Sequence, residues 1–192
     1  NCYVDLKETC LRSETTVKVF DQMRKLQSYT DEGSPGRDWN VATGMVIEGK
    51  AGFQIMGDWA KGEFTAAGKV PGVDYYCAAT PSNNGYLYNV DSFIFYKSSD
   101  PDKQAGQKLL AKLMMGKNFQ KVFNLYKGSI PARLDVSMDE FDKCAKTSNA
   151  DIKTAGAKGG LVPSFAHGMA QGNTMKAALQ DIITEHFNSD MS

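Results

Sequence analysis

One stretch of the 192-residue sequence restricts the fold more than any other. Val90–Tyr96 has the length of a strand, and its centre, Phe93–Phe95, is continuously apolar, which is typical of a strand buried in a sheet. Pro101 then lies in the first turn of a long helix that extends to Met115, because the missing N–H of proline is harmless there. A buried strand followed by a helix predicts an α/β fold.

Helical patterns dominate the rest of the chain. Val17, Phe20, Met23 and Leu26 recur at helical spacing behind Ser13, which can cap the first of these helices. Short apolar runs separate several helices, so the predicted class is α/β with an excess of helix. The predicted helices cover about 15–29, 40–48, 59–67, 101–115, 117–126, 138–154 and 174–187, and the predicted strands cover 51–56, 75–79 and 90–96.

The charges of the chain balance. Lys and Arg together number 22, and so do Asp and Glu, so no net charge attracts nucleic acid or an anionic membrane. We therefore expect no nucleic-acid partner. No run approaches the roughly 18 consecutive apolar residues of a membrane span. The sequence opens on Asn1 in what resembles the middle of a domain, so we expect that an upstream segment was removed or is absent.

Four cysteines, Cys2, Cys10, Cys77 and Cys144, are spaced too irregularly for a zinc site built from paired Cys-x-x-Cys motifs. Their even number permits disulfides in an oxidising compartment without demonstrating any. A local disulfide between Cys2 and Cys10 would restrain the end of the chain. Cys77 and Cys144 are equally consistent with small buried apolar residues.

Familiar catalytic motifs are missing from the sequence. It has no Gly-x-Ser-x-Gly elbow, no His-Glu-x-x-His, no phosphate-binding loop of Walker type and no dinucleotide-binding glycine motif after a strand. No nucleophile, base and oxyanion site can be assembled from the spacing of its residues. We therefore expect neither an enzyme nor a bound cofactor or metal ion.

Both tryptophans lie at predicted element ends. Trp39 follows a turn rich in Gly and Pro, and Trp59 stands where a predicted strand meets a helix. A single tryptophan in such a place usually fills a surface gap. Two of them near polar loops favour a carbohydrate platform, because an indole ring can cover the apolar C–H face of a sugar.

Three polar residues could bind the hydroxyl groups of such a sugar. Asp91 lies at the start of the predicted strand, Lys127 at a helix end before a turn, and His167 in the long Gly-rich segment 156–172. Long irregular segments in compact domains are usually functional. Each residue also has a structural interpretation: Asp91 as a cap, Lys127 as a partner of the helix dipole and His167 as a structural hydrogen-bonding group. Spacing alone does not bring the three together.

Four motifs resemble the sugar-binding proteins of ABC importers, the extracellular solute-binding protein family 1. The first and longest has a helix ending at Gly-Lys, a short apolar run, and Gly-Asp-Trp opening the next helix. The motifs occur in the order found in that family, over most of the chain from about Thr15 to Phe187. They are Val46–Ala60, Asn89–Phe93, Lys127–Arg133 and Val162–Gly168. Asp, Lys and His within these motifs resemble the glucose- and mannose-binding branch.

The resemblance implies a fold of the type II periplasmic-binding-protein kind, in which two α/β lobes close over a sugar. Residues 1–80 and 117–192 would belong to the C-terminal lobe, and 81–116 would contribute a strand and helix to the N-terminal lobe. The resemblance implies that the sugar-binding residues are Trp39, Trp59, Asp91, Lys127 and His167. It also makes Cys77–Cys144 a candidate disulfide.

The implied function is capture of a monosaccharide in the periplasm, with glucose as the favoured sugar, and its delivery to an ABC importer permease. Alternatives are a disaccharide or polyol receptor of the same fold, a carbohydrate-active enzyme, or an isolated interaction module. Family members are longer, and their opening half supplies most of one lobe. We therefore expect the missing N-terminal half as a partner, from the same precursor or a second chain. Without it, Val90–Met115 would expose apolar surface.

Overall fold

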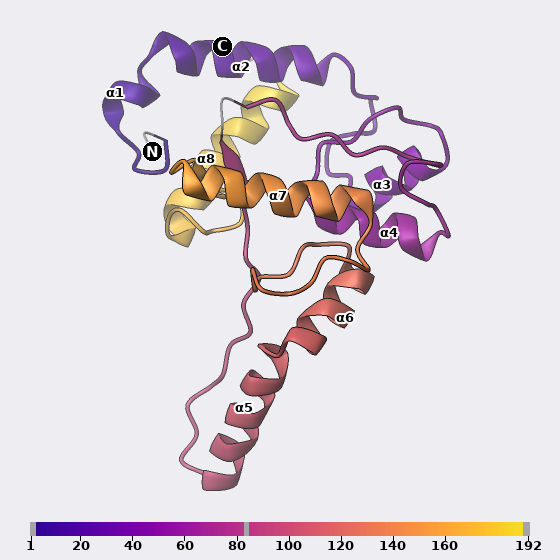
Figure 1. Ribbon diagram of the computed structural model, residues 1–192. Helices are drawn as coiled ribbons and strands as arrows, with labels where there is room; N and C mark the ends of the chain where they lie inside the picture. The colour runs from indigo at the N-terminus through magenta and orange to yellow at the C-terminus, as the bar shows by residue number, and fades with distance from the viewer. Residues whose placement is uncertain (1–2, 83–84, 190–192) are drawn as a thin grey trace. The chain divides into compact units, whose positions relative to one another are not determined.

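The computed structural model describes residues 3–82 and 85–189 (Figure 1). The chain forms two compact units. Unit 1 contains the described residues within 1–37, 84–90 and 159–192, and unit 2 contains those within 38–83 and 91–158. The fold is α/β, with mostly helices and one small parallel sheet. The predicted class is therefore confirmed, and each unit is described by itself below.

Unit 1 combines a two-stranded sheet with a pair of packed helices. The strands pair in parallel, with Tyr86 opposite Leu161. Helix α2 packs on α8, where the buried His186 ring meets Phe20 edge-on at 4.8 Å and its Nε2 lies 3.0 Å from the Phe20 carbonyl oxygen. The elements of unit 1 are α1 (Glu8–Leu11), α2 (Glu14–Gln27), β1 (Tyr86–Tyr88), β2 (Leu161–Pro163) and α8 (Asn173–Asn188).

Unit 2 is helical and contains the main apolar core. Val136, Phe141 and Ala145 are buried together, and a disulfide joins Cys77 to Cys144 with a Cα–Cα distance of 5.7 Å. The disulfide implied by the family resemblance is thus present. The elements of unit 2 are α3 (Trp39–Ile47), the 3₁₀ turn η1 (Asp58–Ala60), α4 (Lys61–Ala66), α5 (Pro101–Met114), α6 (Lys117–Lys127) and α7 (Lys143–Ala157).

Every predicted helix forms, and most helices begin or end where a capping residue or a proline predicts it. The Ser13 hydroxyl accepts from the Thr16 N–H at the start of α2, and Pro101 begins α5. Helix α7 is the exception, because it starts at Lys143 and not near Met138. There the Asp142 carboxylate accepts from the Ala145 N–H at 2.8 Å, so this residue sets the helix start.

The three predicted strands are wrong. Residues 51–56, 75–79 and 90–96 are irregular, and the two strands that do form, β1 and β2, have three residues each. A strand exists only where a neighbour accepts and donates its backbone hydrogen bonds. In the described part of the chain no strand lies beside these three runs. Most of their side chains are left open to solvent, and Phe53 is 95% exposed.

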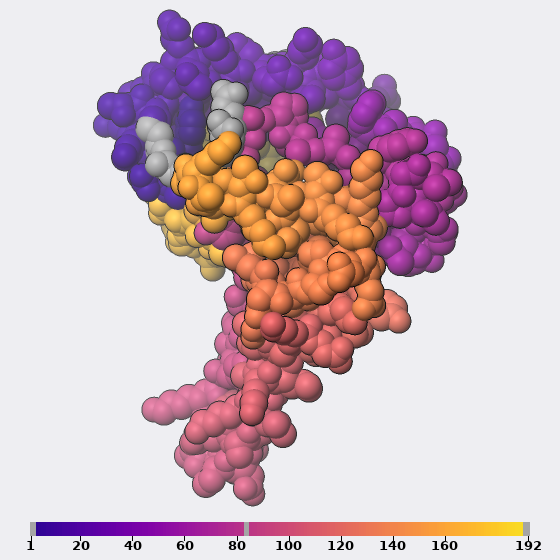
Figure 2. Space-filling model, viewed as in Figure 1, coloured from indigo at the N-terminus to yellow at the C-terminus, as the bar shows by residue number. Residues whose placement is uncertain are grey.

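Exposed apolar side chains lie on α5 and on the segment before it. Ile94 and Leu109 are 77% and 70% exposed, and Phe93, Leu110 and Leu113 are also exposed. Figure 2 shows α5 projecting to solvent beyond α6. The apolar surface expected for Val90–Met115 in the absence of a partner is therefore observed. Among the residues that the structure describes, no helix combines the length and apolarity needed to cross a membrane.

Tyr75 has a buried hydroxyl group without a hydrogen-bond partner among the described residues. Its ring stacks on Phe64, with centroids 4.1 Å apart. Burial raises the pKa of Tyr75 to about 12, and the negative charge of Asp142 acts in the same direction. A buried polar group that makes no hydrogen bond destabilises the folded state.

Tyr75→Phe is therefore expected to raise the free energy of unfolding, by about 1 kcal/mol in urea titrations at neutral pH. The neighbouring Tyr76, 84% exposed, provides the control, and Tyr76→Phe should leave the free energy of unfolding unchanged. Because the pKa of Tyr75 in the folded state is raised above its ordinary value of 10.0, the wild type should also lose stability as the pH rises from 10 towards 12. A less stable Tyr75→Phe variant would show that the hydroxyl has a partner.

Candidate functional site

Lys127, one of the predicted site residues, is the last residue of α6. Helix α6 ends there because Gly128 adopts a left-handed φ of 87°. The backbone at this point touches the first turn of α4, where a Cβ on Gly62 would lie 2.8 Å from the Lys127 carbonyl oxygen. Glycine at 62 and 128 thus allows the two helices to approach through their backbones, which fixes where α6 ends.

The Lys127 ammonium forms an ion pair with the Asp91 carboxylate. It also lies 5.8 Å from the centre of the Phe123 ring. The Lys127 side chain is 30% exposed and the Asp91 side chain 63% exposed, so a ligand in solvent can reach both. The structure thus brings together two predicted site residues that are 36 positions apart.

Trp59 lies in η1, and its indole ring folds back over Gly57. A Cβ on Gly57 would overlap that ring, so only glycine leaves room for it here. The residue between them, Asp58, turns its carboxylate towards the loop that follows α6 and accepts the Ile130 N–H at 2.9 Å. The Gly-Asp-Trp motif is therefore joined directly to the Lys127–Arg133 motif.

Asp58 is a residue that sequence reasoning missed. Burial raises the pKa of its carboxyl, while the Ile130 N–H and the positive charges of Lys61 and Lys127 act to lower it. The sequence signal was its place inside the Gly-Asp-Trp motif. Nothing in the spacing, however, indicated a partner 72 residues away.

Lys61 and Asp142 form a second ion pair in the same region. The Lys61 Nζ lies 2.7 Å from Asp142 Oδ2, and their side chains are 8% and 34% exposed. Burial acts to raise the pKa of Asp142, but the hydrogen bond from Lys61, the Ala145 N–H and the Lys61 charge together lower it. This pair joins the start of α4 to the start of α7.

Trp39, the first residue of α3, is partly exposed. Its carbonyl oxygen accepts the Gln54 side-chain amide at 2.9 Å and lies 2.9 Å from the Thr43 hydroxyl. These contacts attach the irregular 51–56 run to α3. Trp39 shares unit 2 with Trp59, Asp91 and Lys127.

His167 belongs to unit 1, in the turn after β2. Its Nδ1 lies 2.7 Å from the hydroxyl of Ser164, a residue that is itself buried. The Ser164 N–H donates to the Tyr88 carbonyl oxygen at 2.8 Å, which attaches the turn to β1. Ser164 thus sets the orientation of the imidazole ring.

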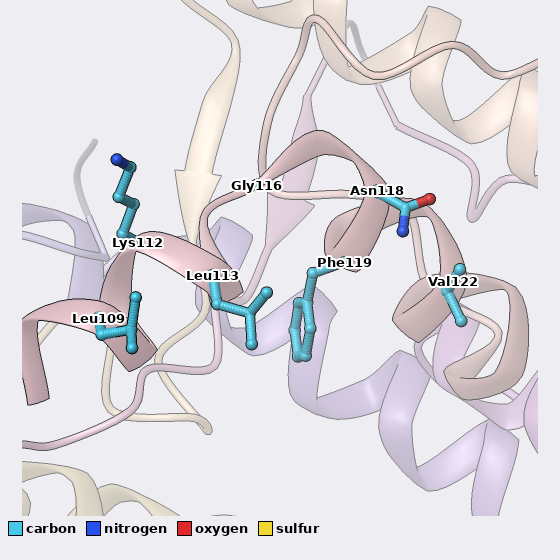
Figure 3. Close-up of a pocket in the computed structure, with 7 residues that line it drawn as sticks. All are labelled: Leu109, Lys112, Leu113, Gly116, Asn118, Phe119 and Val122. Atoms are coloured by element: carbon cyan, nitrogen blue, oxygen red, sulfur yellow. The ribbon is translucent and has the colours of Figure 1, made fainter. Parts of the chain in front are cut away.

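A groove of about 530 Å³ lies elsewhere in unit 2, between the end of α5 and α6. Leu113 and Phe119 lie side by side in it, while the Lys112 side chain points away from them (Figure 3). Its other lining residues are Leu109, Gly116, Asn118 and Val122. None of the predicted sugar-binding residues lines it.

Comparison with known proteins gives the family. Residues 3–156 match bacterial extracellular solute-binding proteins. The chain belongs to this family. The family predicted from the four motifs is thereby confirmed, and the glucose- and mannose-binding branch stays a prediction. The matched family consists of solute-binding proteins.

Relatives of the chain carry names that agree with the family. It is 47% identical over 191 residues to a probable sugar-binding periplasmic protein of Brucella suis, covering 99% of this chain and 45% of that protein. A protein of the same name in Rhizobium meliloti is 44% identical, with 99% and 46% covered. An ABC transporter extracellular-binding protein of Pyrococcus horikoshii is 34% identical, with 93% and 39% covered.

Two facts follow from these comparisons. The predicted periplasmic location is confirmed, because the relatives are named periplasmic and the family is extracellular. The chain spans less than half the length of the relatives that it matches.

Proposed function

We propose that this chain is the C-terminal half of a receptor that captures a monosaccharide and delivers it to the permease of an ABC importer. Glucose is the favoured sugar. The observation that carries the proposal is the 44% and 47% identity, over 99% of the chain, to relatives named as sugar-binding proteins. The Pyrococcus horikoshii relative, named as part of an ABC transporter, supports the importer.

The Lys127–Asp91 pair suits the chemistry of a sugar. A sugar hydroxyl both donates and accepts hydrogen bonds, so one ligand can accept from the Lys127 ammonium and donate to the Asp91 carboxylate. Hydrogen bonds to charged groups are about twice as strong as neutral ones. In this proposal Trp59 and Trp39 cover the apolar face of the sugar ring.

His167 is proposed to add a hydrogen bond from the turn after β2. The Ser164 hydroxyl beside its Nδ1 holds the ring in one orientation, and an oriented ring can favour one hydroxyl geometry over another. Closure of two lobes over the sugar would complete the set of contacts around it. Such closure is a population shift driven by the preference of the ligand for the closed state.

The lobe assignment is part of the same proposal. Residues 1–80 and 117–192 would form the C-terminal lobe, and 81–116 would belong to the N-terminal lobe. Two observations support a partner polypeptide equivalent to the first half of the relatives. The chain covers only 45% of the Brucella suis protein, and the groove and apolar surface at α5 are open to solvent.

Glucose is expected to stabilise the protein when it is prepared with that first half. At a glucose concentration of about 100 Kd the free energy of unfolding should rise by about 2.7 kcal/mol. The midpoint of thermal unfolding should rise by several degrees, and the fluorescence of Trp39 and Trp59, the two tryptophans of this chain, should change. Differential scanning calorimetry and a fluorescence titration measure the two effects.

The controls are single substitutions at the proposed site. Asp91→Ala and His167→Ala should each abolish or severely weaken the glucose response, and wild-type affinity in either variant would remove that residue from the site. If millimolar glucose changes nothing while a disaccharide or a polyol does, the glucose assignment is wrong and the receptor takes that solute. Incubation with disaccharides should release no product, and a released monosaccharide would indicate a carbohydrate-active enzyme.

A further inference from the structure

The loop after α6 is held from outside its own helix. It carries the third motif, and Lys127 stands at its start. Two separate contacts fix it to the α4 region: the backbone approach of Gly62 to the Lys127 carbonyl oxygen, and the hydrogen bond from the Ile130 N–H to Asp58 Oδ2 at 2.9 Å. One contact lies at each end of the stretch 127–130, so together they set its position.

The first of these contacts involves backbone atoms on both sides. In the second, the Asp58 carboxylate is the only side-chain group. It lies at the start of η1 and is mostly buried, which makes an ionised carboxyl unfavourable there unless polar or charged groups surround it. The groups that compensate are the Ile130 N–H and the cations of Lys61 and Lys127. Asp58 thus interacts with the loop twice, through the Ile130 amide and through the charge of Lys127.

We propose that Asp58 is a positioning residue for the sugar site: its carboxylate holds the turn 127–131, and with it the Lys127 ammonium, where Lys127 pairs with Asp91. The inference builds on the proposed function, because it assigns to Lys127 a role in sugar binding. Asp58 itself does not contact the sugar. It acts through the backbone that carries Lys127.

The hydrogen bond from the Ile130 N–H to the side-chain oxygen carries most of this role, and the attraction between the carboxylate and the Lys127 charge adds to it. An asparagine amide oxygen can also accept the Ile130 N–H, whereas alanine offers no acceptor. Asp58→Asn should therefore keep the turn in place and Asp58→Ala should release it. Asp74 gives a matched control in the same unit, since its carboxylate accepts the Val70 N–H at 2.7 Å in an exposed turn.

The binding experiment measures the glucose Kd of four single variants and one double variant by calorimetric titration. Asp58→Ala should weaken binding by about tenfold or more, while Asp58→Asn and Asp74→Ala should stay within about threefold of the wild type. Lys127→Met should weaken binding, and adding Asp58→Ala to it should cause little further loss, because both changes affect the same contact. Wild-type affinity in Asp58→Ala, or fully additive losses in the double variant, would overturn the proposal.

A second measurement needs no sugar and separates this inference from the proposed function. In Asp58→Ala the Ile130 amide should exchange its hydrogen about tenfold faster or more, and the NMR signal of the Lys127 side-chain amine should shift. Neither should change in Asp74→Ala. If the wild type binds no sugar yet Ile130 loses protection, the proposed function fails and the positioning role stands. If Ile130 keeps its protection in Asp58→Ala, the positioning role is wrong whatever the protein binds.

Discussion

Removing the Cys77–Cys144 disulfide is expected to lower the free energy of unfolding by about 4 kcal/mol. The bond closes a loop with a sequence separation of 67 residues. Cross-linking residues so far apart removes many conformations from the unfolded chain, and the loss grows with the logarithm of loop length. This is the largest single contribution to stability that we expect in unit 2.

The folded state gives a local reason for the same result. Cys77 lies in the irregular segment 75–79, which has no strand beside it among the described residues, and Cys144 is the second residue of α7. The disulfide therefore attaches an irregular segment to the apolar core that contains Ala145. Tyr75, whose ring stacks on Phe64, lies two residues from the attachment point.

The test compares the wild type with the double variant Cys77→Ser and Cys144→Ser in urea unfolding without reductant. Cys10 is disulfide-bonded as well, and Cys2 lies outside the described residues. The double variant should therefore be measured again with reductant, so that any further loss is assigned to the Cys10 bond. Equal stability of the wild type and the double variant without reductant would show that the loop is already restrained by other contacts.

Helices were predictable from this sequence because their hydrogen bonds are local. Each carries its own signals, such as the Ser13 cap of α2 and the Pro101 start of α5. The strand predictions failed for the opposite reason, since 90–96 needs partners from elsewhere. The prediction that this run exposes apolar surface without a partner was correct, because Ile94 is exposed.

In the candidate site, too, some features could be predicted from the sequence, and others depend on contacts between distant residues. Motif resemblance predicted Asp91 and Lys127 as members of one site, and they form an ion pair. The residues around them depend on tertiary contacts that no local pattern encodes. Asp58 reaches Ile130 across 72 positions, and Lys61 reaches Asp142 across 81. The roles of Trp39, Trp59 and His167 in sugar binding stay predictions.

Asp142→Ala is expected to lower the free energy of unfolding by about 3 kcal/mol. Two interactions are lost together. The Lys61 ammonium, on a side chain that is only 8% exposed, loses the carboxylate 2.7 Å away, and α7 loses the cap that accepts the Ala145 N–H. Leaving one member of a buried ion pair without its partner is more destabilising than removing both.

The relative effects of four variants test that explanation. Asp142→Asn retains a capping oxygen and should be more stable than Asp142→Ala by about 1 kcal/mol. Lys61→Met should lose less than Asp142→Ala, because the Asp142 side chain is 34% exposed and water can solvate it. Adding Lys61→Met to Asp142→Ala should restore part of the lost stability, since no buried charge then lacks a partner. A double variant less stable than Asp142→Ala would contradict the argument.

The pH dependence follows from the same pair. The pKa of Asp142 in the folded state is lowered below its ordinary value of 3.8, so the folded state binds fewer protons there than the unfolded state does. The stability contributed by the carboxylate is therefore complete above pH 3.8 and is lost as the pH falls through the lower folded pKa. Asp142→Asn has no such proton to bind. The difference in stability between the wild type and Asp142→Asn should shrink in acid, and a constant difference from pH 7 to pH 2 would show that the ion pair contributes nothing.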